Sequence, residues 1–144
     1  MQIVADLMTK NLLTITAEHS MKNVHDLITK KGIRHIPIMS QDNKTMVGLI
    51  THKIMIAKVI SLMTEYGAEG LLEQEMKTSV MDIAVTDFDK VYAQDSLQYA
   101  AEYFLNNKNG CLPVFEKSEE QDDKLVGMLS SSDFVKLSLN LLQS

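Results

Sequence analysis

The sequence predicts an α+β fold, a tandem repeat of two β-α-β-β-α units. The prediction rests on an internal duplication, on two capped helical patterns and on short apolar runs typical of strands. When the 144-residue chain is compared with itself at an offset of 76, residue types agree without a gap from Val4 over Val80 to Met39 over Phe115. We therefore divide the chain into a first repeat at 1–58, a helical linker at 59–78 and a second repeat at 79–144.

Each copy predicts the same elements in the same order. A short strand near Leu12–Ile15 precedes a helix for which Ser20 is a suitable N-cap and Gly32 a suitable stop. The second copy repeats this helix from Ser96 to Asn109-Gly110. Two strands then follow in each copy, at 33–39 and Met46–Thr51 in the first and at Cys111–Phe115 and Leu125–Ser130 in the second.

The first strand of each of these pairs contains a proline, Pro37 or Pro113. Proline has no backbone N–H, so it usually occupies strand positions where no ladder hydrogen bond is required. We expect both of these strands to lie at a sheet edge, or the prolines to lie at a strand end. The second strand of each pair is an apolar run, which is typical of strands covered on both faces by helices.

Composition and charge exclude several classes of function. A net charge of −5 and a pI near 5.3 argue against a nucleic-acid-binding surface, because such surfaces need clustered Lys and Arg. No run approaches the about 18 apolar residues of a membrane span, so no membrane insertion is expected. The single cysteine, Cys111, excludes an internal disulfide and fits a reducing compartment, which predicts a cytoplasmic protein.

The chain also lacks the residue patterns that mark catalytic and metal centres. His19, His25 and His52 have no ligand-like spacing to one another, and no nucleophile lies in a recognisable elbow. The acidic loop at 119–123 is expected to be solvated. We therefore predict no metal, no cofactor and no enzymatic activity.

Two motifs recur in register and carry a resemblance to a known family. The first copy reads Asp-Leu-Met-Thr, then a helix, Gly-Ile-x-x-Ile-Pro-Ile, a polar loop and Val-Gly-Leu-Ile-Thr, and the second copy repeats the pattern. This pattern resembles a CBS domain, and two copies resemble the tandem pair called a Bateman module. The resemblance implies pseudo-two-fold packing, clefts between the repeats, an adenosine-containing ligand and a regulated partner protein.

The resemblance also implies where the ligand binds. Such pairs use a Gly-x-x-[Ser/Thr]-x-x-Asp segment of one copy with the opening segment of the other. The second copy keeps this motif from Gly127 to Asp133, including Ser130, whereas the first copy has Ile54 where the aspartate is expected. By resemblance Thr9 lines the cleft of Asp133, and Val85 lines the cleft of Ile54. One competent and one degenerate site are expected.

Each candidate has a structural alternative. Asp133 follows three serines and could only cap a helix, Arg34 could be an exposed strand-end residue, and His35 could be a packing residue. Arg34 suits a bidentate phosphate contact. The full predicted ligand-binding set is Thr9, Leu13, Ile33, Arg34, His35, Ser130 and Asp133, with Thr51 and Lys53 as weaker candidates.

The predicted function is that of a sensing module. We expect it to bind an adenosine-containing nucleotide of the AMP, ADP, ATP or S-adenosylmethionine type in the inter-repeat cleft, and to signal to a separate regulated protein. The alternative is a CBS-like scaffold that binds no ligand and acts through protein contacts. A homodimer is also expected, because the following residues exceed what one small core absorbs: Ile56, Val59, Ile60, Met63, Phe134, Leu137 and Leu141.

Overall fold

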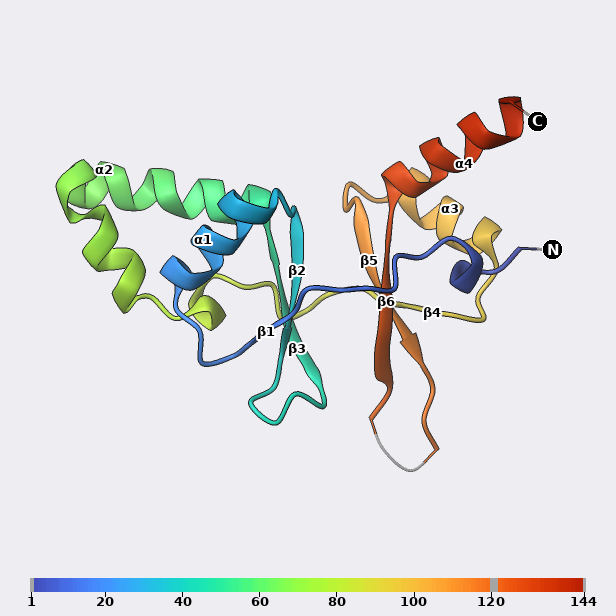
Figure 1. Cartoon of the computed structure of the whole chain (residues 1–144), viewed down its shortest axis with the longest axis horizontal. Coiled ribbons are helices and arrows are strands. Elements are labelled where there is room, and N and C mark those ends of the chain that lie inside the picture. The colour runs from blue at the N-terminus through green and yellow to red at the C-terminus, as the bar shows by residue number, and fades with distance from the viewer. Residues whose placement is uncertain (1, 120–121, 144) are drawn as a thin grey trace. The chain divides into compact units, whose positions relative to one another are not determined.

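The computed structural model describes residues 2–119 and 122–143 and divides into two compact units. Unit 1 combines the chain up to Leu12 with the chain from Asp89 onward, and unit 2 runs from Leu13 to Phe88. The acidic loop predicted at 119–123 is described only in part, since residues 120 and 121 lie outside the described ranges. Each unit holds one three-stranded sheet and its own helices (Figure 1).

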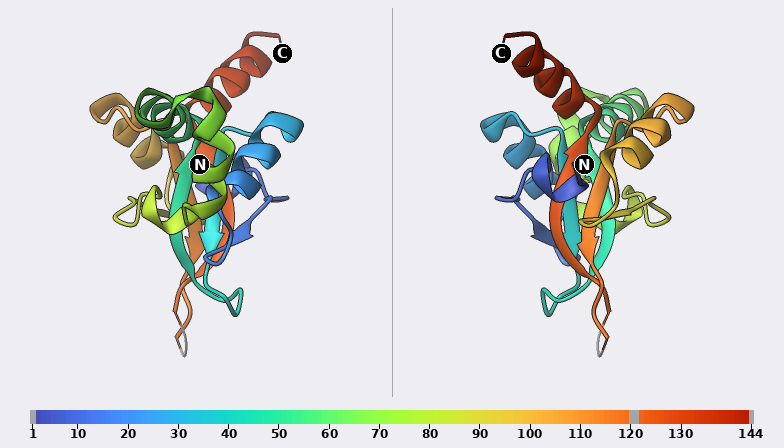
Figure 2. Two further views of the ribbon diagram at one scale, coloured as in Figure 1. Left: turned by 90° about the vertical axis from the view of Figure 1, so that its left-hand side faces the viewer. Right: turned by 90° about the vertical axis from the view of Figure 1, so that its right-hand side faces the viewer.

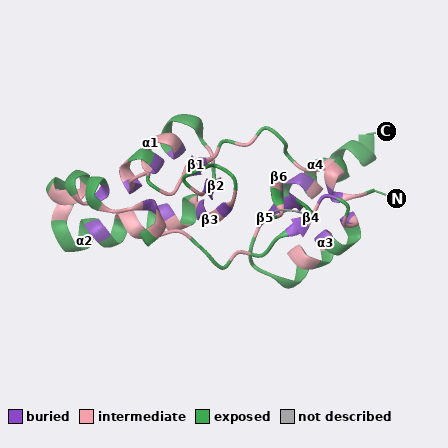
Figure 3. Cartoon of the chain, turned by 90° about the horizontal axis from the view of Figure 1, so that it is seen from below, coloured by how far each residue is buried: buried purple, intermediate pink, exposed green. Residues whose placement is uncertain are grey.

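Unit 2 contains a mixed sheet with the strand order β1-β2-β3. The short strand β1 runs parallel to β2, and β2 pairs antiparallel with β3. The core lies between this sheet and the apolar sides of two helices (Figure 3). The elements are β1 (Ile15–Thr16), α1 (Met21–Lys31), β2 (His35–Met39), β3 (Met46–Thr51), α2 (His52–Lys77) and the 3-10 helix η2 (Val80–Asp82).

Unit 1 repeats this arrangement with the strand order β4-β5-β6. The parallel and antiparallel pairings are the same, and the β5–β6 hairpin can be followed in both views of Figure 2. Its elements are the 3-10 helix η1 (Val4–Asp6), β4 (Val91–Tyr92), α3 (Leu97–Asn106), β5 (Cys111–Glu116), β6 (Lys124–Ser130) and α4 (Ser131–Gln143). The predicted α+β tandem repeat is therefore confirmed.

The opening segment of each repeat belongs to the unit that holds the body of the other repeat. Val4 of η1 donates its N–H to the carbonyl of Asp95 (2.8 Å), and Val80 of η2 donates to the carbonyl of His19 (3.0 Å). Both valines are fully buried, each in the core of its unit. The first residues of the chain thus complete unit 1.

The helices begin where the sequence predicts. The Ser20 hydroxyl accepts the N–H of Asn23, and the Ser96 hydroxyl accepts that of Tyr99. Gly32 ends α1 in the left-handed conformation (φ 63°), which glycine adopts without steric cost. The helix α3 ends at Asn106, three residues before the predicted Asn109-Gly110 stop, and β1 begins only at Ile15.

The strands that contain the prolines are central in their sheets, so the edge location expected for them is wrong. Pro37 is the third residue of β2 and pairs with Leu49, while Pro113 is the third residue of β5 and pairs with Met128. The edge strand β1 has only two residues, and its pairing starts at Ile38, one residue after Pro37. The missing N–H of each proline is tolerated because the parallel neighbour does not extend to it.

The predicted linker at 59–78 falls within α2 and its C-cap, Thr78. The helix is interrupted at Gly67, which has φ 75° and ψ 169°, and the residues after it turn back along unit 2 (Figure 1). Leu62 before the break is buried in the core, and Leu71 after it packs against the same core. Among the described residues, no helix has the length and apolar character needed to cross a membrane.

Candidate functional site

Three of the predicted ligand-binding residues come together in unit 1. The N–H of Thr9 donates to the carbonyl of Met128 (2.8 Å), and the N–H of Met128 donates to the carbonyl of Thr9 (3.0 Å). Met128 lies two residues before Ser130, which is the last residue of β6, and α4 follows directly. The strand end, the helix start and the opening segment therefore meet around Thr9, Ser130 and Asp133.

Asp133 is the third residue of α4 and is only 9% exposed. Its Oδ2 accepts the backbone N–H of Ser130 at 2.8 Å. This is the bond by which a side chain in the first turn of a helix satisfies the N-cap amide, so the capping alternative for Asp133 is realised in the structure. The carboxylate has a second oxygen, and an ionised carboxylate has about four acceptor positions in all, so the cap does not use its full capacity.

Residues near Asp133 in this part of unit 1 carry hydroxyl groups. The Ser130 Oγ and the Ser132 Oγ are 2.7 Å apart and share a hydrogen bond. Thr9, which carries the third hydroxyl, is exposed. Hydroxyls can donate and accept, whereas the carboxylate only accepts. The group is chemically suited to a ligand with vicinal hydroxyls, such as a ribose. Ser132 was not among the predicted residues, although the run of three serines was a signal for it.

The Asp133 carboxylate also affects the pKa of Cys111 in the neighbouring strand β5. Burial and the nearby Asp133 carboxylate raise the pKa of the Cys111 thiol to about 12. Cys111 begins β5 and is 1% exposed. Its thiol is therefore neutral and unreactive in the folded protein, as expected for a small buried apolar side chain.

The equivalent place in unit 2 has the same backbone and different side chains. Val85 and Leu49 exchange both backbone hydrogen bonds (2.8 and 2.9 Å), as Thr9 and Met128 do in unit 1. The Thr51 hydroxyl accepts the N–H of Ile54 (3.1 Å) and so caps α2. Ile54 is half-buried against the core. The position equivalent to Asp133 therefore carries no carboxylate in unit 2.

The remaining predicted residues all lie in unit 2. Arg34 is exposed, and its carbonyl accepts the N–H of His52 (2.8 Å). His35 is half-buried opposite Thr51, and burial, together with Arg34, lowers its pKa. Lys53 is exposed in the first turn of α2. The structure thus brings Arg34, His35, Thr51 and Lys53 to one end of the β2–β3 pair, with Ile33 next to them in the chain and Leu13 before β1.

Neither unit offers a metal centre within the ranges that the structure describes, because no group of three His, Cys, Asp or Glu residues is placed to hold an ion. The buried carboxylates there are Asp133 and Glu75, and each has a hydrogen-bonding partner. Sequence reasoning did not identify Glu75, because its partner His25 is 50 residues away in the chain.

Comparison with known proteins gives a consistent result. The family model for the CBS domain matches the chain twice, at residues 4–61 and 80–140. A homoserine O-acetyltransferase from Methanococcus vannielii is 30% identical over 132 residues, which are 92% of this chain and 24% of that protein. The chain thus spans about a quarter of the length of this curated relative.

Two solved structures resemble this chain over nearly its full length. CBSX2, a CBS-pair protein from Arabidopsis thaliana, was solved in complex with AMP and has a TM-score of 0.76 at 24% identity, covering 98% of each chain. The CBS domain pair of protein MJ0100 was solved with 5′-methylthioadenosine and S-adenosyl-L-methionine. It has a TM-score of 0.72 at 19% identity and covers 97% of this chain and 98% of its own. At these identities the similarity shows a common fold.

Proposed function

Because the chain belongs to the CBS-domain family and carries two CBS domains in tandem, we propose that it is a regulatory module that binds an adenosine-containing nucleotide and signals to a partner protein. The acetyltransferase activity named for the longer relative is not carried over to this chain, which matches 24% of that protein. A module of this kind needs no catalytic group of its own. A cytoplasmic location stays a prediction, based on the single buried Cys111.

The observation that carries this proposal is the group of Thr9, Ser130 and Asp133 in unit 1. A largely buried carboxylate that accepts one hydrogen bond and has further acceptor positions, near serine hydroxyls in the chain, favours a ligand that donates hydrogen bonds through paired hydroxyl groups. A ribose offers such a pair, and hydrogen bonds to a charged acceptor are stronger than neutral ones. The AMP, methylthioadenosine and S-adenosylmethionine bound by CBSX2 and MJ0100 are all ribose-containing adenosine compounds, which supports the same ligand class here.

Arg34 remains our proposed phosphate contact, because it is exposed and a guanidinium suits bidentate binding of phosphate. The proposed roles of Leu13, Ile33, His35, Thr51 and Lys53 also remain predictions. In unit 2 the place equivalent to Asp133 is taken by Ile54, which cannot accept a hydroxyl, so we propose one nucleotide per chain.

A second candidate function is a scaffold that binds no ligand. It is favoured by one observation, the hydrogen bond from the Ser130 N–H to Asp133, since this bond gives the aspartate a structural role without any ligand. In the first candidate function the charge of Asp133 contributes to ligand affinity, and in the scaffold it does not. The affinity of a variant without this charge can be measured.

The test is calorimetry with AMP, ADP, ATP and S-adenosylmethionine on the intact chain and on Asp133→Asn. An asparagine can still accept the Ser130 N–H through its side-chain oxygen, so the cap is kept while the charge is lost. We expect one site per chain and an affinity loss of about tenfold or more in the variant, since a hydrogen bond to a charged group is worth about 1.5–3 kcal/mol.

Asp87→Asn is the control, because it removes an exposed carboxylate from unit 2 and should leave the affinity unchanged. Binding that is equally strong in Asp133→Asn, or two ligands per chain, would show that the site is misplaced. Failure of every adenosine compound to bind the unmodified chain would favour the scaffold.

A further inference from the structure

The opening segment of the chain, residues 3–9, forms part of the candidate site, and we call it the strap. Val4 anchors one end of it in the core of unit 1, where its side chain is fully buried. The N–H of Ala5 donates to the carbonyl of Ala93 at 3.0 Å. At the other end, Thr9 and Met128 exchange two backbone hydrogen bonds. The strap is therefore held at both ends against unit 1.

Gly127 lies directly under the Thr9 end of the strap. A Cβ atom at this position would lie 2.9 Å from the carbonyl oxygen of Thr9 and 2.7 Å from the Sδ of Met8, closer than such atoms approach in proteins. The Met8 side chain can move aside, but the Thr9 oxygen is backbone, so a methyl group at 127 must displace the strap. The φ angle of Gly127 is not positive, so its backbone conformation does not require glycine. The lack of space for a Cβ atom does.

Gly48 is the matching glycine in unit 2, where Leu49 and Val85 form the equivalent backbone pair. A Cβ at Gly48 would lie 3.3 Å from the carbonyl oxygen of Val85 and 3.3 Å from the Cβ of Ala84. Such contacts are tight but need a shift of only a few tenths of an ångström. The two glycines therefore differ in how strictly the space is needed, although they occupy the same position in the repeat.

We propose that Gly127 is a positioning residue and that the seating of the strap on β6 controls the affinity of unit 1 for its ligand. The inference rests on the proposed function, because it assigns this control to the nucleotide site. A seated strap holds Thr9 beside Met128, two residues from Ser130, and a displaced strap removes Thr9 from the group. Coupling of this kind is reciprocal, so ligand binding must also hold the strap more firmly.

The first test compares Gly127→Ala with Gly48→Ala by amide hydrogen exchange and AMP calorimetry. In Gly127→Ala we expect the Thr9 and Met128 amides to exchange at least about tenfold faster and AMP to bind about tenfold or more weakly, within the usual range of coupling between two sites. In Gly48→Ala we expect Thr9 exchange and AMP affinity to stay as in the unmodified chain.

The second test loosens the strap from its far end, so that the outcome does not depend on one variant. Val4→Ala removes buried methyl groups from η1, and Val80→Ala makes the same change in η2, where the valine is equally buried. Only Val4→Ala should accelerate exchange at Thr9 and weaken AMP binding. In the unmodified chain, saturating AMP should slow exchange at Ala5 and Thr9.

The outcomes separate this inference from the proposed function. Unchanged exchange at Thr9 in both Gly127→Ala and Val4→Ala would overturn the seating of the strap. Faster exchange with unchanged AMP affinity would overturn its control of the site. Failure of the unmodified chain to bind any adenosine compound would overturn the proposed function and this control together, and the exchange rates would still decide whether Gly127 seats the strap.

Discussion

Asp133 is compatible with two interpretations of the sequence, a helix cap and a ligand-binding residue. An aspartate after three serines is typical of a helix cap, and the bond to the Ser130 N–H confirms that capping. The ligand-binding role depends instead on which residues lie near Asp133 in the fold. Thr9 is held in this part of unit 1 by its backbone hydrogen bonds to Met128. Local sequence therefore predicts the cap, whereas the candidate site could be predicted only from the resemblance, because residues 9 and 133 are far apart in the chain.

Cys111 provides a prediction at the same scale. Burial and Asp133 raise the pKa of its thiol from its ordinary value of 9.0 to about 12. Between these two pH values the unfolded thiol loses its proton and the folded thiol keeps it, so unfolding releases a proton. The free energy of unfolding should then fall as the pH rises above about 9, by up to about 1.4 kcal/mol per pH unit from this group.

Urea denaturation at pH 8 and pH 10 measures this effect in the unmodified chain and in Cys111→Ala. Tyrosines and lysines also titrate in this range, so the difference between the two proteins isolates the thiol. The fall in stability should be smaller in Cys111→Ala. An equal fall in both proteins, or rapid alkylation of folded Cys111 at pH 8, would contradict the assignment.

At the scale of elements, local patterns predicted most helices and strands. The sequence predicted a helical linker at 59–78, but not the course of the chain after the interruption of α2 at Gly67. Leu71 packs against the core of unit 2, and Glu75 is 3% exposed with its Oε1 bonded to the Nδ1 of His25 on α1. A contact between residues 50 positions apart depends on how the two helices pack, and no local pattern encodes it.

The hydrogen bond between His25 and Glu75 predicts that His25 helps to hold the second half of α2 in place. His25→Ala leaves the Glu75 carboxylate buried without that partner, which should lower the free energy of unfolding by about 1–3 kcal/mol. A double-mutant cycle with Glu75→Ala should show coupling of about 0.5 kcal/mol or more. Asp26→Ala breaks the partly exposed Lys22–Asp26 pair on the same helix and is the control, with a much smaller expected effect. Denaturation curves showing no coupling between His25 and Glu75 would refute this.

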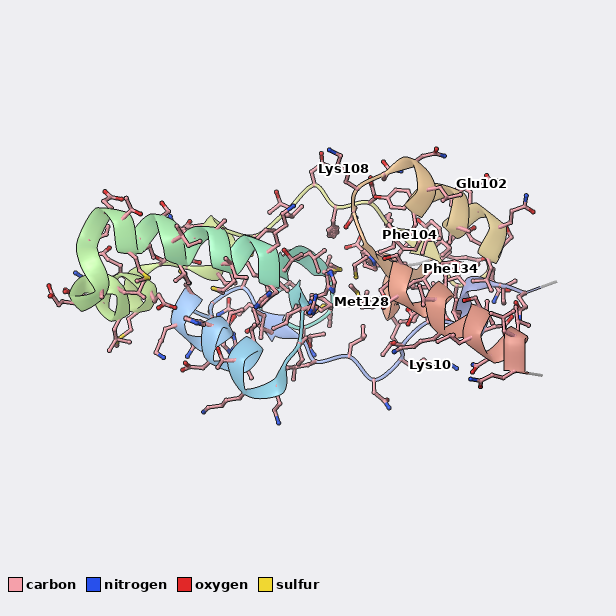
Figure 4. All side chains as sticks on the ribbon, turned by 90° about the horizontal axis from the view of Figure 1, so that it is seen from above. Lys10, Glu102, Phe104, Lys108, Met128 and Phe134 are labelled. Carbon is pink, nitrogen blue, oxygen red and sulfur yellow. The ribbon has the colours of Figure 1, made fainter. Side chains whose placement is uncertain are left out.

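For the molecule as a whole, the duplication predicted the repeated element order, and the matches to the CBS family at 4–61 and 80–140 agree with it. The exposed apolar surface was harder to predict, because a count of apolar residues does not tell which of them pack into the core of their own unit. Phe134 and Leu137 were expected to exceed the core, yet both pack partly against the core of unit 1. The rings of Phe134 and of Phe104 on α3 form an edge-to-face pair with 5.9 Å between their centroids, and Figure 4 labels both residues.

The apolar surface that remains on α2 carries the last prediction, a homodimer. Ile56, Ile60 and Met63 follow one another at helical spacing and are 44%, 59% and 43% exposed. Exposed apolar stripes of this kind mark interaction sites, and a stripe on one chain can pair with its copy across a two-fold axis. We expect sedimentation to give about twice the 16.2 kDa of one chain, and Ile60→Glu to give a monomer. Leu105→Glu is the control, because Leu105 is 85% exposed on α3, away from this stripe in sequence, and the dimer should persist. A monomer at every concentration of the unmodified chain, or a dimer that survives Ile60→Glu, would show that this stripe does not join two copies.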